Sequence, residues 1–379
     1  MQAPDVILRG KDNGEEMIIH YQTKRGTDIY GLGIPNVYAE SDWDLGPTWC
    51  YLIKDRKKTL IDTGRFGNYE ALKALLGSIR IELSDIDRII ITHSHEDHDG
   101  NLADIHTSAK AELWAHKLYH QMISYYPDID NGALHPELPG SCRLCIMPEK
   151  IRNDCLSYHQ ERSMLNIDLV LEDNTTIEEE NLLFLHTPGH TPDSIIVILE
   201  NEVIFTGDAI LPSITPHPSL ALAFEVNCDI LPEDFREGNR IYGLMNYIKS
   251  LNRIAYLESQ PYPTTLPAHR IYYDNQFNLI HDPSERAKEI IQFHIDRCKS
   301  ILDIAADKSA TIEDIALQYF HSRLLKGPGK FLAMNEISAH VEVMEKSGDI
   351  IRTGESKDVI EPTGTANYQR ELGQYLEPV

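Results

Sequence analysis

Short apolar runs that end in polar residues recur between residues 59 and 269. Thr59–Ile61 stops at Asp62, and the β-branched run Arg88–Thr92 stops at His93, as buried strands do. Tyr69–Leu76, between them, has the apolar spacing of a helix. The pattern returns in four later runs, Leu182–Leu185, Ser194–Leu199, Val203–Thr206 and Thr264–Leu266. We therefore predict an α/β fold whose strands deliver polar side chains at their ends.

The pattern changes in two other regions. Short apolar runs that end in polar residues do not recur in residues 116–164, which predicts a partly helical insertion that covers the strand ends. After His281 the pattern is helical, with predicted helices at Pro283–Ile304, Thr311–Phe320 and Met334–Lys346 and a short hairpin around Asp349–Arg352. Because one core rarely exceeds about 250–300 residues, we predict a large domain at 1–281 and a winged-helix-like domain at 282–379.

The composition indicates the class of the protein and where in the cell it is expected. Hydrophobic residues make up 42% of the chain and charged residues 25%, as in globular proteins. No apolar run approaches the roughly 18–20 residues that span a bilayer, and the N-terminus lacks the pattern of a signal peptide. We expect a cytoplasmic protein with no membrane partner.

The net charge of −24 would repel a phosphate backbone. Residues 282–379 hold 12 Lys and Arg against 17 Asp and Glu, which argues against DNA reading by the winged helix. We expect a small-molecule substrate and no nucleic-acid partner. The C-terminal domain would instead wall the substrate cleft or form an interface of a homo-oligomer.

The densest group of candidate ligands is His93-x-His95-x-Asp97-His98, directly after a predicted strand. Neutral imidazoles and a carboxylate suit Zn²⁺ or a similar first-row ion. A lone histidine at a strand end is usually an ordinary hydrogen-bonded residue. Four candidate ligands in six residues, with further His and Asp at later strand ends, favour a metal site.

These residues resemble the HxHxDH signature of the metallo-β-lactamase superfamily. Asp62 in Ile61–Gly64 is similar to that family's first motif, and His190, Asp208 and His269 are similar to its third, fourth and fifth. The resemblance implies a four-layer αβ/βα sandwich with two divalent ions, zinc first, with iron or manganese as alternatives. It implies one ion on His93, His95 and His190, a second on Asp97, His98 and His269, and Asp208 as the bridge.

By the same resemblance Asp62 supports a ligand without binding metal. For His186, just before the third motif, we predict only a local hydrogen bond. Two bound ions would lower the pKa of water from about 15.7 towards ~7 and so provide a hydroxide for hydrolysis. Asp97 is the candidate group that takes or orients the proton, and both Asp97 and Asp62 are assigned to the catalytic site.

The stretch after Asp208, Gly207–His217, resembles glyoxalase-II-like hydrolases of the lactamase-beta-2-like group, which also carry a winged helix. This implies a small ester-like substrate, foremost a thioester such as an acyl-CoA or a glutathione conjugate. Three alternatives stay open, namely an RNA phosphodiesterase, an iron-dependent redox protein or sulfur dioxygenase, and a ligand-sensing nucleic-acid-binding regulator. His217, Tyr272 and Tyr273 are candidate substrate contacts or ordinary packing residues.

The predicted insertion contains a second group of candidate ligands, Cys142-x2-Cys145-x9-Cys155-x3-His159. Clustered thiols in a chain without a secretion signal are typical of a structural zinc site, although this spacing is not a standard ribbon or finger. The alternative is buried or redox-active free thiols. We expect Cys50, Cys228 and Cys298, which are isolated in the sequence, to be core residues.

Overall fold

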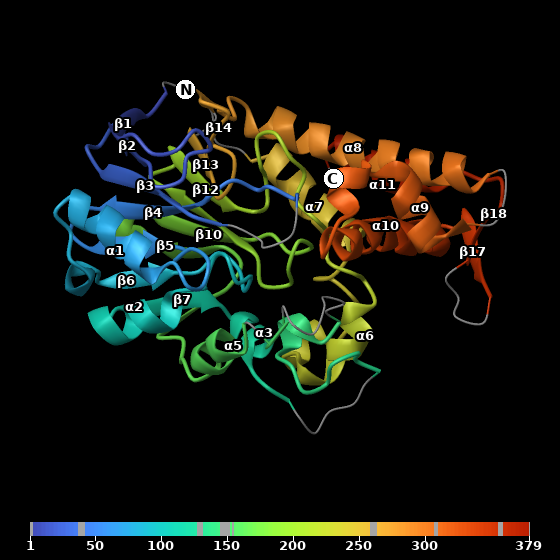
Figure 1. Ribbon diagram of the computed structural model, residues 1–379, viewed down its shortest axis with the longest axis horizontal. Coiled ribbons are helices and arrows are strands. Elements are labelled where there is room, and N and C mark those ends of the chain that lie inside the picture. The colour runs from blue at the N-terminus through green and yellow to red at the C-terminus, as the bar shows by residue number, and fades with distance from the viewer. Residues whose placement is uncertain are drawn as a thin grey trace.

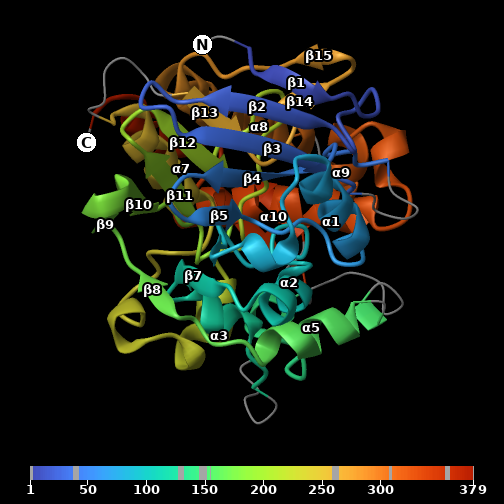
Figure 2. The ribbon, with the colours of Figure 1, turned by 90° about the vertical axis from the view of Figure 1, so that its left-hand side faces the viewer.

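Two β-sheets stacked face to face form the body of the protein (Figures 1 and 2). The structure is a computed structural model that describes residues 3–36, 42–126, 132–144, 152–153, 155–257, 264–306, 310–354 and 359–378. The first sheet has the order β1 to β8, with strands Asp5–Leu8, Ile18–Gln22, Asp28–Ile34, Thr48–Lys54, Lys58–Ile61, Arg88–Ile90, Glu112–His116 and Leu169–Leu171. Its strands are antiparallel up to β5 and parallel from β5 to β8.

The second sheet has the order β13-β12-β11-β10-β9. Its strands are Thr175–Ile177 (β9), Leu182–His186 (β10), Ile195–Leu199 (β11), Val203–Gly207 (β12) and Thr264–Pro267 (β13). Only β12 and β13 pair in parallel among them. The predicted strands in this part of the chain are therefore confirmed to within one or two residues at each end.

Helices cover the outer face of each sheet and complete four layers. Helices α1 (Tyr69–Ser78) and α2 (Leu102–Ala109) pack on the first sheet through residues such as Leu72 and Ile105. Helices α7 (Leu244–Ala255) and α8 (Pro283–Ala305) pack on the second sheet, against Ile196 and Ile204. A third core, which includes Trp49 and Phe205, fills the space between the sheets. Alternating strand residues thus feed cores on both faces.

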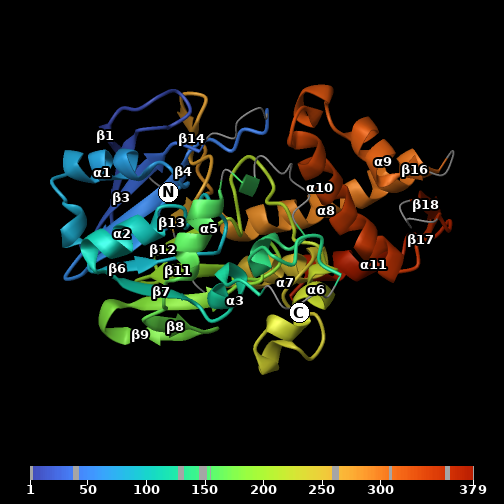
Figure 3. The same ribbon diagram turned by 60° about the horizontal axis from the view of Figure 1, so that its bottom comes forward.

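The insertion follows β7 and lies below the sandwich in the view of Figure 1. Its described elements are α3 (Tyr119–Ile123), a 3₁₀ turn at Gly140–Cys142 and α5 (Leu156–Ser163). Helix α3 packs beside α6 (Ala223–Asn227) in a small apolar cluster that includes Leu118 and Ala223 (Figures 1 and 3). The predicted partly helical character of this region is thereby observed.

The C-terminal region combines helices with a small sheet at the far side of α8 (Figure 3). Helices α9 (Ile312–Tyr319), α10 (Gly329–Lys346) and α11 (Tyr368–Gly373) surround strands β16 (Ala310–Thr311), β17 (Ile350–Thr353) and β18 (Val359–Pro362). Thr311 caps α9 as predicted, since its side chain accepts from the Asp314 amide. Helix α10 begins five residues before the predicted Met334, and the winged-helix assignment stays a prediction.

The remaining described elements are short. A two-stranded ribbon, β14 (Tyr272–Tyr273) with β15 (Gln276–Phe277), follows the second sheet. Single 3₁₀ turns lie at Leu83–Asp85, Glu178–Glu180, Cys228–Ile230, Glu233–Phe235, Ser322–Leu325 and Gln374–Leu376. None of the described helices is long and apolar enough to cross a membrane.

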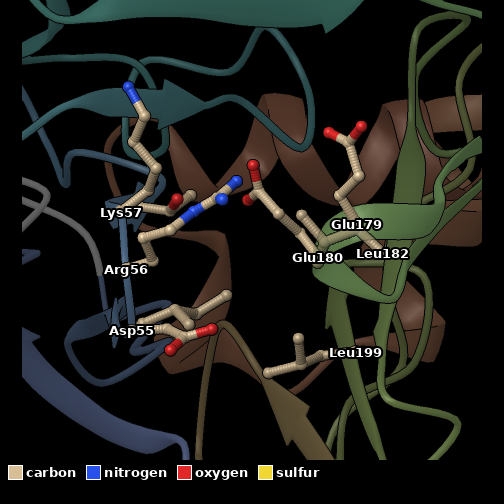
Figure 4. A pocket seen from close by; sticks show the side chains of 9 residues that line it. Asp55, Arg56, Lys57, Glu179, Glu180, Leu182 and Leu199 are labelled. Atoms are coloured by element: carbon tan, nitrogen blue, oxygen red, sulfur yellow. The ribbon is translucent and has the colours of Figure 1, made fainter.

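A pocket of about 170 Å³ lies at the start of β5 and β10, lined in part by Arg56, Glu180 and Leu199. Arg56 and Glu180 point toward one another across it (Figure 4). The predicted ligand residues follow the opposite ends of these strands, so this pocket is remote from them.

Candidate metal centre

The predicted ligands meet at one edge of the sandwich, where strands from both sheets end. Strand β6 leads to His93, β12 leads directly to Asp208 and β13 leads to His269. His190 comes from the loop between β10 and β11. Three overlapping groups have their ligand atoms within 4.8 Å of one another, namely His93–His95–His190, His93–His98–Asp208 and Asp97–His98–His269.

Asp208 lies between two sets of ligand atoms. In the first set, His95 Nδ1 is 3.1 Å from His93 Nε2 and 3.1 Å from His190 Nε2. In the second, His269 Nε2 is 3.2 Å from Asp97 Oδ2. Asp208 Oδ2 is 3.6 Å from His190 Nε2, whereas Asp208 Oδ1 is 3.5 Å from the Nε2 atoms of both His98 and His269. Each oxygen of Asp208 therefore faces one set.

Neighbouring acceptors fix the orientation of three ligand imidazoles. His98 Nδ1 is 2.8 Å from Asp62 Oδ2, His190 Nδ1 is 2.6 Å from the His217 carbonyl and His269 Nδ1 is 3.1 Å from the Pro47 carbonyl. Because these acceptors require a hydrogen on Nδ1, each Nε2 presents its lone pair to the centre. The rings are held in the tautomer that binds a metal.

Buried atoms without partners test whether divalent ions fit the centre. His98 Nε2, His269 Nε2 and Asp208 Oδ1 have no hydrogen-bond partner among the described residues, and all three side chains are buried. Such atoms are costly unless something satisfies them. Five imidazoles and two carboxylates are the donor set of a first-row dinuclear site. The residues fit two divalent ions.

The protonation states of His95, His190 and Asp97 fit metal binding. Burial lowers the pKa of His95 and of His190 to about 4, so both rings are neutral at neutral pH. Burial alone would raise the pKa of Asp97, but His98 and His269 outweigh it and hold that pKa well below its usual range. Neutral imidazole and ionised carboxylate are the forms that coordinate metals. Burial would lower the pKa of His98 and of His269, but Asp208 and Asp97 outweigh it and raise both pKa values, so an ion would take the place of a proton at each Nε2.

Asp62 supports the centre from an unusual backbone conformation. Its φ of 58° lies in the left-handed region, which is uncommon for a residue other than glycine. The carboxylate accepts from the Thr92 amide and hydroxyl, each at 2.8 Å, as well as facing His98. Asp62 thus holds the strand end and a ligand together, the supporting role expected from the sequence.

Sequence reasoning missed Asn36, which lies two residues after the end of β3. Its Nδ2 donates to Asp97 Oδ2 over 2.8 Å, and its side chain is 5% exposed. An isolated asparagine after a strand has no spacing that would have distinguished it. Asn36 fixes one carboxylate oxygen of Asp97.

A buried ion pair between the insertion and the ligand loop was also missed. Arg162 Nη1, from α5, donates to Asp99 Oδ2 and to the Ser94 carbonyl, both at 2.8 Å. Tyr119 donates to Asp99 over 2.7 Å, and Tyr158 contacts both charged groups. Ser94 lies between the ligands His93 and His95, and Asp99 directly follows His98, so helix α5 anchors the loop that carries them.

The structure places the other candidate residues in different environments. His186 lies outside the centre, where its Nε2 is 2.8 Å from the Pro192 carbonyl, in the local role predicted for it. His217 borders the centre and is 30% exposed, so a substrate contact stays open. Tyr272 is buried in the core between the sheets, and Tyr273 donates to Asp44.

The cysteines divide into two groups. The structure brings Cys142 and Cys155 next to His159, while Cys145 lies outside the described residues. Cys50 and Cys298 are buried core residues as expected. Cys228 is only partly buried, because it opens a 3₁₀ turn on the surface of the α6 region, so its assignment to the core was wrong.

The chain is similar to several known proteins. The chain is 25% identical over 334 residues to the probable metallo-hydrolase YqjP of Bacillus subtilis, covering 84% of this chain and 92% of that one. It is 26% identical over 160 residues to the atrochrysone carboxyl ACP thioesterase of Passalora fulva, covering 41% of this chain and 35% of that protein.

A solved structure shares the fold over most of its length. The metallo-beta-lactamase family protein TTHA1429 from Thermus thermophilus superposes with a TM-score of 0.65 at 23% identity, covering 88% of this chain and 98% of that one. The family model of the metallo-beta-lactamase superfamily matches residues 43–269, which include all seven predicted ligands. This chain therefore belongs to the metallo-beta-lactamase superfamily, whose members are generally hydrolases.

Proposed function

We propose that this protein is a dinuclear metal-dependent hydrolase of a small thioester. The observation that carries the dinuclear part is the position of Asp208, whose two oxygens each face one set of buried ligand atoms. When bound, two divalent ions supply a water that ionises near neutral pH and polarise the carbonyl of the substrate. Hydrolysis then needs few further groups from the protein.

The chain supplies a proton acceptor and a rigid frame. Asp97 is ionised and borders both Asn36 and His269, so it is positioned to accept or orient the proton of the attacking water. Asp62 accepts from the Thr92 hydroxyl and also faces His98. These contacts fix the positions of His98 and of the segment after β6 relative to Asp97. Because these groups are already oriented, little reorganisation accompanies the reaction.

A thioester is supported over other esters by the relative from Passalora fulva, whose name records acyl-carrier thioester cleavage. Because that protein is similar to this chain along only part of its length, the acyl and thiol groups of the substrate must be identified by experiment. The net charge of −24 supports a small substrate over a polyanion.

Turnover of acyl-CoA and acyl-glutathione thioesters, with metal content measured on the same samples, tests the proposal. His190→Gln removes a ligand and should abolish thioester cleavage and lower the metal content. His186→Gln is the matched control, since it changes a partly buried histidine four residues away whose Nε2 faces the Pro192 carbonyl, and should keep both. Wild-type turnover that survives complete removal of metal would overturn the proposal.

The role of Asp97 needs a separate variant. Asp97→Asn keeps an oxygen ligand but accepts a proton poorly, so cleavage should fall roughly a hundred- to ten-thousand-fold. Because Asp97 is also a predicted ligand, activity is measured on Asp97→Asn protein that still holds both ions. Near-normal activity in that sample would remove Asp97 as the proton acceptor.

A further inference from the structure

The C-terminal helices reach the metal centre through His217, which lies in the segment between β12 and α6. The backbone carbonyl of His217 accepts from His190 Nδ1 over 2.6 Å and so sets the orientation of that ligand. The imidazole of His217 faces α10, where its Nε2 lies 3.7 Å from Glu336 Oε2. One residue therefore joins a predicted ligand to the C-terminal region.

Glu336 is itself held in a buried ion pair. Arg297 Nη1 of α8 donates to Glu336 Oε1, and the two side chains are 7% and 4% exposed. The guanidinium also lies over three aromatic rings, 4.4, 5.2 and 5.6 Å from the ring centroids of Phe293, Tyr319 and Phe320. Because the rings and the carboxylate restrict the guanidinium together, Glu336 is fixed relative to α8 and to the end of α9.

His217 Nε2 is a buried atom that has no hydrogen-bond partner among the described residues. Since Arg297 binds Oε1 of Glu336, Oε2 is the oxygen that faces this nitrogen. A carboxylate oxygen repels a lone pair and attracts an N–H group, so a hydrogen on Nε2 points the imidazole at Glu336. This attraction restrains the His217 side chain and, with it, the carbonyl that accepts from His190.

We propose that Glu336 is a positioning residue for the metal centre, which acts through His217 on the ligand His190. The C-terminal region would then be part of the metal centre rather than a separate binding module. This inference rests on the dinuclear part of the proposed function and does not depend on the identity of the substrate.

The effect is expected at only one of the two ions. His190 belongs to the first set of ligands, with His93 and His95. In the second set, His98 is oriented by Asp62 after β5, and His269 is oriented by the Pro47 carbonyl before β4. Those two contacts come from the first sheet and not from α10.

The test measures both zinc affinities of the full chain by competition with a chelator, and His190→Gln identifies the ion of the first set. His217→Ala removes the imidazole but keeps the backbone carbonyl and the buried Arg297–Glu336 pair. We expect it to bind the ion of the first set about tenfold more weakly, the lower end of the usual cost of losing an orienting group. The other ion should keep its affinity.

Glu336→Gln keeps the shape of the side chain but removes its charge, and it should produce the same selective loss. Glu345→Gln is the matched control on the same helix, because Glu345 pairs with Arg352 of β17, and it should keep both affinities. Unchanged affinities in His217→Ala would overturn the inference even if Glu336→Gln failed to fold. Equal weakening of both ions would also overturn it, since that indicates a general loss of structure. A wild type that binds no zinc would contradict the dinuclear proposal as well.

Discussion

At the scale of single residues, the centre is organised by groups that touch the ligands rather than by the ligands alone. Asp62 holds His98, the Pro47 carbonyl holds His269 and Asn36 holds Asp97. Each contact removes a rotational freedom that an ion would otherwise have to restrict on binding. The contribution of such residues should be measurable as metal affinity.

Asn36 gives the first prediction of this kind. Asn36→Ala removes the hydrogen bond to Asp97 and should weaken metal binding about 10–100-fold, the usual cost of losing a group that orients a ligand. Titration with a competing chelator measures it. Asn68→Ala is the control, because the Asn68 side chain precedes α1 and donates to the Arg65 carbonyl rather than to a predicted ligand. Unchanged affinity in Asn36→Ala would show that Asp97 needs no such support.

At the scale of elements, α5 joins the insertion to the ligand loop through a buried ion pair. Arg162 and Asp99 are 1% and 0% exposed as side chains, so water screens neither charge. The two tyrosines that contact Asp99 complete its hydrogen bonding. The pair specifies one position for the helix relative to the loop.

Arg162→Met should therefore destabilise the fold by about 3–5 kcal/mol, because it leaves the Asp99 carboxylate buried without its counter-ion. Urea unfolding measures the loss. The double variant Arg162→Met, Asp99→Asn should lose less than the single one, since no unpaired charge remains. Arg253→Met is the control in a half-exposed pair with Asp173 and should cost about 0–1 kcal/mol. Equal losses in the two arginine variants would contradict the buried-pair account.

Elements and ligands differ in how far the sequence predicts them. Strands β5, β6 and β10 to β13 and helix α8 follow from local apolar periodicity, whereas β1 to β4 and β7 to β9 were not predicted. The ligands follow from a dense motif and strand ends. The Arg162–Asp99 pair joins residues 63 positions apart, and Asn36 reaches Asp97 across 61. Such pairings depend on how the insertion and loops fold back, which no periodicity records. The early start of α10 at Gly329 has a local cause instead, since Pro328 and Gly329 conceal the first turn of the helix.

At the scale of the whole molecule, buried histidines are not confined to the centre. His294 and His340 connect α8 and α10, where His294 Nδ1 lies 2.9 Å from His340 Nε2, and His340 Nδ1 donates to the Glu336 carbonyl. Both side chains are 0% exposed. Burial holds the pKa of each histidine well below the usual range. The nearby His340 and Arg297 lower the pKa of His294 further.

This pair predicts how the stability of the protein depends on pH. In the unfolded chain both histidines take up protons below about pH 6.5, whereas in the folded chain they stay neutral. Stability therefore falls as pH falls below about 6.5, by up to about 1.4 kcal/mol per pH unit for each histidine. The net charge moves toward zero near the isoelectric point of about 5.0, which reduces charge repulsion in the folded protein and so raises its stability.

The double variant His294→Gln, His340→Gln separates the two effects, because every other titrating group in it is the same. Urea unfolding between pH 7.5 and 5.5 should show that the free energy of unfolding falls more steeply with decreasing pH in the wild type than in this variant. Equal slopes would mean that the two rings are protonated in the folded protein as readily as in the unfolded chain.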